Sequence, residues 1–371
     1  MSSKGRKTAS GRKRKGGHGW IGGLSFTVVA AAFAFLQLLS YLSVVVNPVK
    51  TWFFSLFGLM FPLLFLVNSA LLVWAVARRP KYMVLPLLAL LPSLFFVGRF
   101  IRFSGPEEME AVSGPKVKIL TYNVDRFAYK SRKADQKERM DSVFNFLSRS
   151  DADIICLQEF SCADLGALQY LVKNRLPGYF AEYYLFKGKN RYSGNVTLSR
   201  NKALAKGKIL FEDSVNLALW SEYDYGGERF RVYNCHFESY AISLSSIWHS
   251  LTGNKEKMQE TGQKYRKSLS RRPEQVDAVL SHFDESPCAG VVCGDFNDNP
   301  MSYTYHRMRR ASKDSFVEAG KGFGASFSAF WPFLRIDYVF VPESWEVLSH
   351  KTSRIRFSDH YPIVAECIAK R

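Results

Sequence analysis

The chain has 371 residues, and its 51 Lys and Arg outnumber its 33 Asp and Glu, which gives a formal net charge of +18. A hydrophobic content of 47% excludes a chain that is disordered throughout. The first 105 residues carry 13 basic residues and no acidic residue, so the remainder holds 38 basic against 33 acidic side chains. The part of the chain after residue 105 is therefore only mildly basic, and charge alone does not identify a nucleic-acid partner.

The amino-terminal region consists of a basic tail, residues 1–19, followed by three apolar runs at 20–46, 52–77 and 82–98. A helix needs roughly 20 apolar residues to cross the hydrocarbon core of a bilayer. The first two runs exceed this length and the third lies at its lower edge. The sequence therefore predicts three transmembrane helices within residues 20–104, and a membrane as a partner.

The distribution of basic residues predicts the orientation of these helices. Seven bases precede the first run, and Arg78, Arg79 and Lys81 lie between the second and third. The positive-inside tendency then places the amino terminus in the cytoplasm and everything after the third run outside it, in a plasma or inner membrane. The alternative is a signal peptide cleaved near Ala34, but apolar sequence continues well past that position to Val46.

A short polar linker, residues 105–115, precedes one large domain at 116–371. Within it, apolar residues recur at helical spacing over 137–147, which predicts an amphipathic helix. Short β-rich runs alternate with such patterns and predict strands at 117–124, 153–158, 194–199, 208–211, 215–221, 229–236, 289–294, 336–341 and 363–368. This order favours an α/β fold with two sheets packed face to face and helices outside.

Polar side chains follow several of these strands. Asn123, Glu159 and His236 each stand at the end of an apolar run. Three motifs lie further along the chain: Gly294-Asp295-Phe296-Asn297, Arg335-Ile336-Asp337-Tyr338 and Ser358-Asp359-His360. Carboxylates, amides and histidines at strand ends are the groups that metal-assisted cleavage of a phosphodiester needs. The pattern therefore predicts a magnesium-dependent phosphoesterase.

Seven blocks in order resemble the endonuclease/exonuclease/phosphatase superfamily. They are Leu120-Thr121-Tyr122-Asn123, Leu157-Gln158-Glu159, Ser193-Gly194-Asn195-Val196, Asn234-Cys235-His236, and the three motifs at 294–297, 335–338 and 358–360. The resemblance implies a four-layered α/β sandwich with two packed mixed β-sheets. It also implies a divalent cofactor, Mg²⁺ with Mn²⁺ as a substitute, and hydrolysis of a phosphate ester by activated water. Relatives include deoxyribonucleases, abasic-site endonucleases, sphingomyelinases and inositol-polyphosphate phosphatases.

The same resemblance implies roles for individual residues. Glu159 is the principal metal ligand, Asp359 is a second and Asn123 assists. Among the catalytic residues, Asp295 and Asn297 bind the attacking water, and His360 pairs with Asp337. His236 contacts or protonates the scissile phosphate. Asn195 is expected to bind the substrate, although a Gly-Asn turn explains it nearly as well.

The segment 239–272 stands out as an insertion after the His236 strand. Apolar residues at helical spacing precede a cluster of bases in it, as in a helix that rests on anionic headgroups. A polar loop over the cleft is the equal alternative. The six cysteines show no metal-ligand spacing, and most fall in predicted core strands, which favours reduced, buried thiols.

The resemblance determines the reaction and leaves the leaving group open. The first hypothesis is an extracytoplasmic nuclease or general phosphodiesterase. The second is a phosphodiesterase or phosphatase that acts on a phospholipid at the membrane surface. The third, a silent membrane scaffold, is disfavoured because every block retains its functional side chain. No obligate protein partner is inferred.

Overall fold

The computed structural model describes residues 18–78, 80–103, 105, 114–128, 135–239 and 255–369. Most of the basic tail, most of the predicted linker and the apolar part of the insertion, residues 240–254, lie outside this range.

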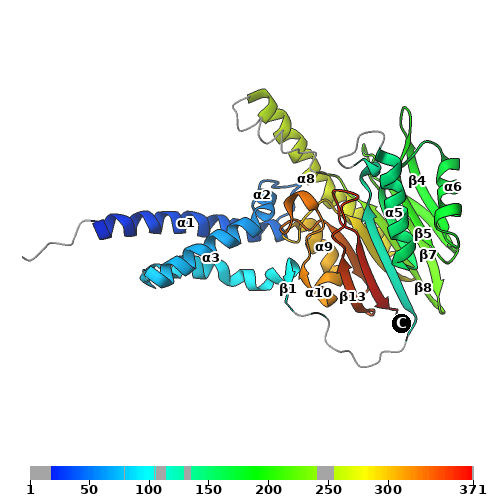
Figure 1. Ribbon diagram of the computed structural model, residues 1–371. Coiled ribbons are helices and arrows are strands. Elements are labelled where there is room, and N and C mark those ends of the chain that lie inside the picture. Colours follow the sequence, from blue (N-terminus) through cyan, green and yellow to red (C-terminus); the bar gives the residue numbers. More distant parts are fainter. Residues whose placement is uncertain are drawn as a thin grey trace, which may run out of the picture.

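Two six-stranded sheets form the centre of the molecule (Figure 1). The first has the order β13-β14-β2-β3-β5-β4, with bounds Glu346–Thr352, Ile363–Ile368, Lys116–Asn123, Ile154–Cys162, Tyr192–Ser199 and Phe180–Lys187. The second has the order β10-β12-β9-β8-β7-β6, with bounds Lys313–Asp314, Asp337–Val341, Ala289–Asp295, Glu228–His236, Leu217–Tyr225 and Ala205–Leu210. Both sheets are mixed, because β2 and β3 are parallel, as are β8 and β9, while the other pairs are antiparallel.

The two sheets pack face to face through alternate side chains of their strands. Val117 and Ile119 of β2 lie in one buried cluster with Val291 of β9 and Val339 of β12. Successive side chains of a strand point to opposite faces, so Leu120 of β2 belongs to a different cluster on the outer face. Each strand near the centre is therefore apolar on both sides, which explains why these strands read as continuous apolar runs.

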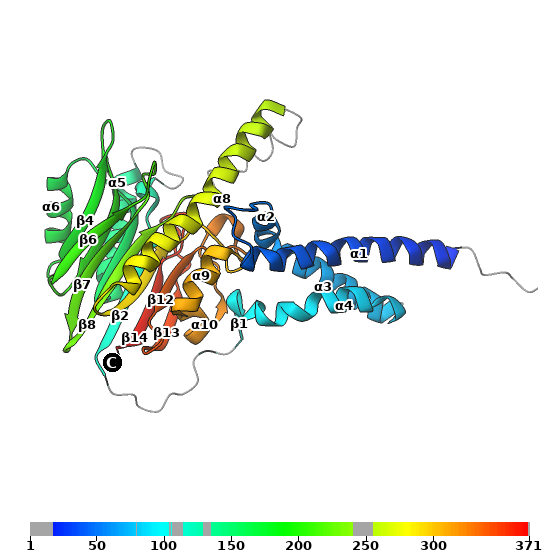
Figure 2. The same cartoon turned by 180° about the vertical axis from the view of Figure 1, so that it is seen from behind.

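Helices cover both outer faces. Helices α5 (Gln136–Ser150) and α6 (Leu165–Arg175) pack on the first sheet, and α8 (Lys255–Asp284) and α9 (Tyr303–Ala311) on the second, as Figure 2 shows from behind. The short α10 (Ser315–Ala319) packs beside β13. The order helix, sheet, sheet, helix agrees with the predicted α/β sandwich. Helix α5 confirms the amphipathic pattern, with Val143, Phe144 and Leu147 fully buried.

The predicted strands next to the polar motifs are present, with bounds shifted by a few residues. Two long strands were missed. The edge strand β4 is only half-buried along its length, and β13 at the opposite edge has only two apolar residues, Val347 and Leu348, followed by Ser, His, Lys and Thr. The insertion contributes the basic half of its pattern to the long helix α8, so a polar loop is the wrong description of residues 255–272.

The amino-terminal region contains two helices that are long and apolar enough to cross a membrane, Ser25–Val45 within α1 (His18–Val45) and Phe61–Arg78, which is α3. The prediction of a third such helix was wrong. Residues 84–99 form α4 (Val84–Leu90) and the 3₁₀ segments η2 (Leu91–Phe95) and η3 (Val97–Arg99) instead. Pro92 lacks a backbone N–H and ends the α-helical ladder within this run.

The helical region packs directly on the sandwich. Its shortest helix, α2 (Phe54–Leu59), approaches the loop after β9 so closely that a Cβ on Gly58 would collide with Ser43 and with the carbonyl of Met301. The Ser43 hydroxyl donates to that carbonyl, and the Asn299 amide donates to the Gly58 carbonyl at 3.0 Å. A small two-stranded sheet, β1 (Ile101–Arg102) with β11 (Gly322–Phe323), completes the junction.

Candidate active site

The fold brings the predicted residues to one rim of the sandwich. Asn123 ends β2, and Glu159 lies in the neighbouring parallel strand β3. In the other sheet, His236 ends β8 and Asp295 ends β9, and the two residues are paired in register. Asp337 begins β12 opposite Asp295. Because the carboxyl ends of parallel strands meet at one edge, and the two sheets are packed face to face, these side chains converge.

Three residues of this rim have unusual backbone conformations. Gly294 has φ of +133°, and a Cβ there would collide with the carbonyl of Cys235, so only glycine allows β9 to approach β8 this closely. Glu159 has φ of +50° and sits at a β-bulge between β3 and β5. Asn297 also has φ of +50°. Non-glycine residues in this region concentrate at functional sites, where the surrounding packing holds them.

A hydrogen-bonded network joins the two sheets. The Asn123 amide donates to Asp295 Oδ2 at 2.9 Å and to Glu159 Oε1 at 3.3 Å. Asn297 donates to the same aspartate twice, from its backbone N at 2.8 Å and its side chain at 3.2 Å. The carbonyl oxygen of the Asn123 side chain accepts from the backbone N of Asp125 at 3.0 Å. Asn123 therefore orients the two carboxylates with its N–H groups.

His360 and Asp337 form a buried pair. The ring Nδ1 lies 2.8 Å from Asp337 Oδ2, and the opposite nitrogen, Nε2, lies 3.7 Å from Asp295 Oδ2 and 3.9 Å from Asp359 Oδ1. Burial alone would lower the pKa of His360, but Asp337 and Asp295 together hold it well above its usual range. Three carboxylates around one ring favour the imidazolium form.

Asp295 titrates in a range that suits proton transfer near neutrality. Burial and the charge of Asp337 raise its pKa to about 6, although the charge of His360 opposes them. The backbone at Asp337, the partner of His360, is held by Ser326. The Ser326 hydroxyl accepts from the backbone N of Ile336 and from that of Asp337, both at 3.0 Å.

His236 faces the same space from the other side. Its Nε2 lies 3.7 Å from Glu159 Oε1 and 3.8 Å from Asp295 Oδ2. Although burial opposes it, the charges of His236 and Arg126 hold the pKa of Glu159 below its usual range. The Arg126 guanidinium makes an ion pair with Glu159 Oε2 at 3.1 Å and is 63% exposed, so this arginine lies at the mouth of the site.

Sequence reasoning missed Asp125 and Arg126. Burial, with the charges of Asp359 and Glu159, raises the pKa of Asp125 to about 7. Asp125, Arg126 and Phe127 have successive φ values of 42°, 51° and 58°, and the fully buried ring of Phe127 anchors this turn. The sequence feature that could have indicated Asp125 is that it is a carboxylate two positions after Asn123.

Asn195 lies apart from this network. Its amide donates to the backbone carbonyls of Asn234 at 2.9 Å and Leu217 at 3.3 Å, which ties β5 to the other sheet. Its Oδ1 is buried and has no hydrogen-bond partner among the described residues. A substrate-binding role for Asn195 remains a prediction.

The donor set fits a hard divalent cation. It offers carboxylate oxygens from Asp125, Glu159, Asp295, Asp337 and Asp359, the ligands that Mg²⁺ prefers. One ligand atom each from Asp295, Asp337 and His360 lies within 4.8 Å of the others. Asp337 Oδ1 is buried without a hydrogen-bond partner among the described residues.

Two packed mixed sheets with carboxylates, amides and histidines at one rim define a hydrolase of phosphoric esters. Residues 120–360 match the Endonuclease/Exonuclease/phosphatase family, and residues 24–100 match a family described as a domain of unknown function. The chain belongs to the endonuclease/exonuclease/phosphatase family of metal-dependent phosphoric ester hydrolases. A search of curated proteins found no match.

Solved structures share this fold. A family protein from Leptotrichia buccalis has 18% identity and a TM-score of 0.52, with 68% of this chain and 100% of that chain covered. One from Bacteroides thetaiotaomicron has 19% identity and a TM-score of 0.51, with 70% and 100% covered. One from Bacteroides vulgatus has 20% identity and a TM-score of 0.51, with 69% and 99% covered. At these identities the likeness concerns the fold alone.

Proposed function

We propose that the protein is a membrane-anchored, magnesium-dependent phosphodiesterase that hydrolyses a nucleic acid or another phosphodiester. The observation that carries the proposal is the position of Asp295. Its carboxylate accepts from Asn123 and Asn297 and faces His236 and His360 within 4 Å. A carboxylate fixed in this way, with a pKa of about 6, is suited to take a proton from water at neutral pH.

Glu159 and Asp359 would hold the metal ion, and Asp125 adds a third oxygen donor beside them. When bound, a divalent ion neutralises negative charge on the phosphate and lowers the barrier to attack. Asn123 would hold Glu159 in position through its amide N–H, and its side-chain oxygen, which accepts from the backbone of Asp125, keeps a second lone pair with which to assist the metal ion. Mn²⁺ shares the preference for oxygen ligands and would substitute.

The chain's own residues would complete the reaction. The water oxygen forms a bond to phosphorus while the bond from phosphorus to the leaving oxygen breaks. Asp295 accepts the proton of the water, and Asn297 keeps the carboxylate oriented. His360, held as a cation by Asp337, stabilises charge on the phosphate oxygens. His236, which lies within 4 Å of Glu159 and Asp295, donates to a phosphate oxygen or to the leaving group.

Membrane anchoring is supported by the exposure of the long helices. Only 33% of the apolar window of Ser25–Val45 is buried, and 22% of that of Phe61–Arg78, whereas a core helix of a soluble protein is mostly buried. Side chains such as Phe35, Leu63 and Val73 are more than half exposed. Surface of this kind needs lipid or another apolar partner.

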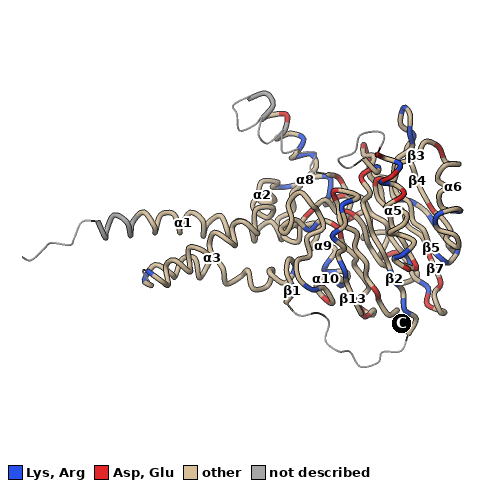
Figure 3. The backbone as a smooth tube through the Cα atoms, viewed as in Figure 1, with Lys and Arg blue, Asp and Glu red and all other residues tan. Residues whose placement is uncertain are grey.

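Orientation follows from where the ends of the helices lie. Figure 3 shows basic residues at the far end of α3, and α1 also begins at that end, away from the sandwich. By the positive-inside tendency this end faces the cytoplasm, so the catalytic domain lies on the opposite side of the membrane. Protease digestion of the catalytic domain in right-side-out but not in inside-out vesicles tests this orientation, and the reverse pattern would reject it.

The activity is tested with the full chain in detergent micelles. We expect hydrolysis of bis-(p-nitrophenyl) phosphate that needs Mg²⁺, stops with EDTA and disappears in Glu159→Gln. Glu212→Gln is the matched control, because Glu212 is an exposed residue outside the site. Turnover that persists in EDTA, or that survives in Glu159→Gln, would contradict the proposal.

A phospholipid is the second candidate substrate, favoured by one observation. The loop from Phe323 to Phe333 begins at the junction with the helical region and then passes the active site, where the ring of Phe327 lies 5.1 Å from that of His360. Its Phe330, Trp331 and Phe333 are 40–44% exposed. Plasmid DNA, RNA and labelled phospholipid vesicles offered in parallel distinguish the two, since turnover of lipid without turnover of nucleic acid would reverse the order.

A further inference from the structure

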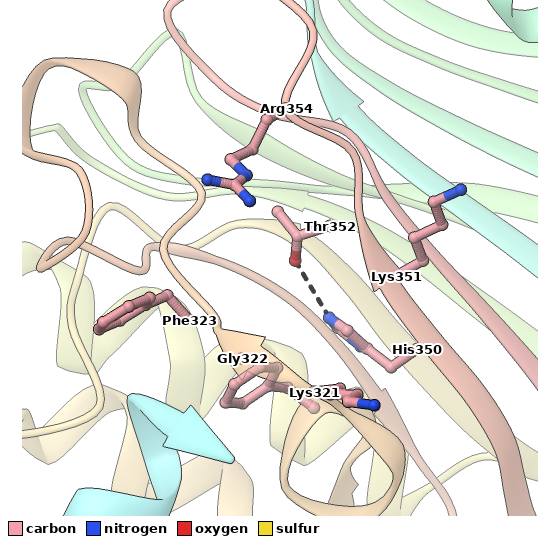
Figure 4. A pocket seen from close by; sticks show the side chains of 8 residues that line it. Lys321, Gly322, Phe323, His350, Lys351, Thr352 and Arg354 are labelled. Carbon is pink, nitrogen blue, oxygen red and sulfur yellow. Dashed lines mark hydrogen bonds between the residues drawn. The ribbon is translucent and has the colours of Figure 1, made fainter. Parts of the chain in front are cut away.

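A pocket of about 290 Å³ lies outside the active site, between α10, β11 and β13 (Figure 4). His350 forms part of its buried floor, while Lys321, Phe323 and Arg354 are exposed at its rim. None of its lining residues belongs to the catalytic network. Neither the phosphoesterase reaction nor the family assignment therefore accounts for this pocket.

The pocket is cationic. Lys321, Lys351 and Arg354 are among its lining residues, and no Asp or Glu is. Within the described part of the chain, no ion pair is recorded for any of these three cations. Figure 4 shows the Arg354 guanidinium directed toward the space between Phe323 and Thr352. A concave site with several bases and no carboxylate selects an anion, and phosphate is the common biological anion that needs several donors.

His350 supplies a polar floor rather than a further charge. Burial and the charge of Arg335 together lower its pKa to about 3, although the charge of Asp314 opposes them. Its Nδ1 is 2.8 Å from the Ser315 hydroxyl, and its Nε2 is 3.3 Å from the Thr352 hydroxyl. The charge of the pocket is therefore carried by Lys321 and Arg354, whereas Figure 4 shows the Lys351 side chain directed away from His350 and Thr352.

The rim of the pocket combines aromatic rings with these bases. Arg354 lies over the ring of Trp331 at 5.1 Å, and Trp331 contacts the ring of Phe323 with centroids 5.8 Å apart. Phe323 and Trp331 are 48% and 40% exposed. Exposed aromatic rings beside Lys and Arg are typical of surfaces at the level of lipid headgroups.

The position of the pocket agrees with this chemistry. Its strand β11 pairs with β1, the first element after the apolar segment, with Ile101 opposite Phe323. The backbone N of Gly324 donates to the carbonyl of Phe100 at 2.9 Å. Phe103, directly after β1, is 84% exposed. The pocket therefore opens beside the point where the chain leaves its apolar helices.

We propose that this pocket binds the phosphate headgroup of an anionic phospholipid in the outer surface of the membrane. The proposal rests on the membrane placement given under the proposed function but not on catalysis. A cavity of this size is suited to a headgroup, while the acyl chains would remain in the bilayer beside Phe103 and Trp331. Free phosphate shares the same chemistry and is the alternative source of the ligand.

The test measures binding of three probes to the full chain in nonionic detergent. They are dioctanoyl phosphatidylglycerol, dioctanoyl phosphatidylcholine and inorganic phosphate, each titrated calorimetrically. We expect phosphatidylglycerol to bind at least about tenfold more tightly than phosphatidylcholine, and Lys321→Gln/Arg354→Gln to weaken it at least about tenfold, because the variant removes two positive charges beside the anionic phosphate. Lys173→Gln/Lys202→Gln removes the same charge from exposed positions outside the pocket and should bind as the native chain does.

Three outcomes overturn the proposal. One is equal binding of both lipids, and another is an equal loss in the control double variant. The third is inorganic phosphate that binds as tightly as phosphatidylglycerol, which would make free phosphate the ligand. The charge-conserving Lys321→Arg/Arg354→Lys should retain most of the affinity, and unchanged melting of each variant without ligand excludes misfolding. Failure of the phosphodiesterase proposal would leave these binding results unaffected.

Discussion

Replacing Asp337 by Asn removes the negative charge from the buried partner of His360. The ring Nδ1 and Asp337 Oδ2 are 2.8 Å apart, and the side chains are 6% and 1% exposed, so water cannot replace the lost partner. A hydrogen bond to a charged group contributes about 1.5–3 kcal/mol, against about 0.5–1.5 kcal/mol for a neutral one. The imidazolium of His360 should therefore lose on the order of 1.4 kcal/mol, which corresponds to a fall in its pKa of about one unit.

This change should appear in two measurements on the full chain. Nitrogen-15 spectra of its histidine side chains should show the titration of His360 moved to lower pH. The kcat for bis-(p-nitrophenyl) phosphate should fall about tenfold, the factor that corresponds to a loss of about 1.4 kcal/mol in the stabilisation of phosphate charge by His360. Mg²⁺ binding is measured alongside, because Asp337 also lies in the compact group of ligand atoms. An unchanged titration of His360 together with unchanged kcat would refute the reasoning.

The same pair should make stability depend on pH. His360 has its pKa raised in the folded state, so its contribution is fully present below the unfolded value of about 6.5 and is lost as pH rises through the folded value. Asp337→Asn should accordingly lower the melting temperature more at pH 6 than at alkaline pH. An equal loss at both would show that the pair contributes through packing rather than charge.

Three further predictions concern other parts of the site and its support. The kcat/KM profile should lose activity with a midpoint near pH 6 on the acid side, because the pKa of Asp295 is raised to about 6 and its ionised form accepts the proton; activity that stays flat down to pH 5 would exclude it as the base. Arg126→Gln should strengthen Mg²⁺ binding measured by calorimetry, because a cation that competes for Glu159 is removed, while KM rises; weaker Mg²⁺ binding would contradict this. Arg335→Met should destabilise the protein by about 3–5 kcal/mol in urea unfolding, because it leaves Asp314 buried without its cation; a loss below about 1 kcal/mol would show that Asp314 is readily neutralised.

The fold was predictable where the sequence pattern is local. Central strands such as β3 and β9 read clearly because their side chains are buried on both faces. The edge strand β4 was missed because its half-buried side chains follow no clean alternation. The third apolar run was misassigned because its length and composition resemble those of a transmembrane helix, while Pro92 and the packing against the two long helices break it.

The candidate site was predictable as a set of residues and not as a geometry. The sequence blocks indicated Asp295 and His360. Nothing in the spacing predicts that the side-chain oxygen of Asn123 accepts a hydrogen bond from the backbone N of Asp125. That contact depends on three successive left-handed residues, which no propensity of Asp, Arg or Phe predicts. For Asn195 the family block indicated the residue but not that its amide donates to the carbonyl of Asn234 in the other sheet, and its substrate-binding role stays a prediction.

The contact between Gly58 and the loop after Asn297 has a consequence for how the protein can be divided. A fragment that starts after residue 105 would strip Met301 of its apolar neighbours Val44 and Phe61, and would deprive the buried guanidinium of Arg335 of the Arg99 carbonyl that it donates to at 2.9 Å. The sandwich is thus packed against the amino-terminal helices through the loop after β9 and through Arg335. Kinetic measurements on the isolated sandwich would therefore concern a protein in which the loop after β9, which carries Asn297, has lost its contacts with the helices.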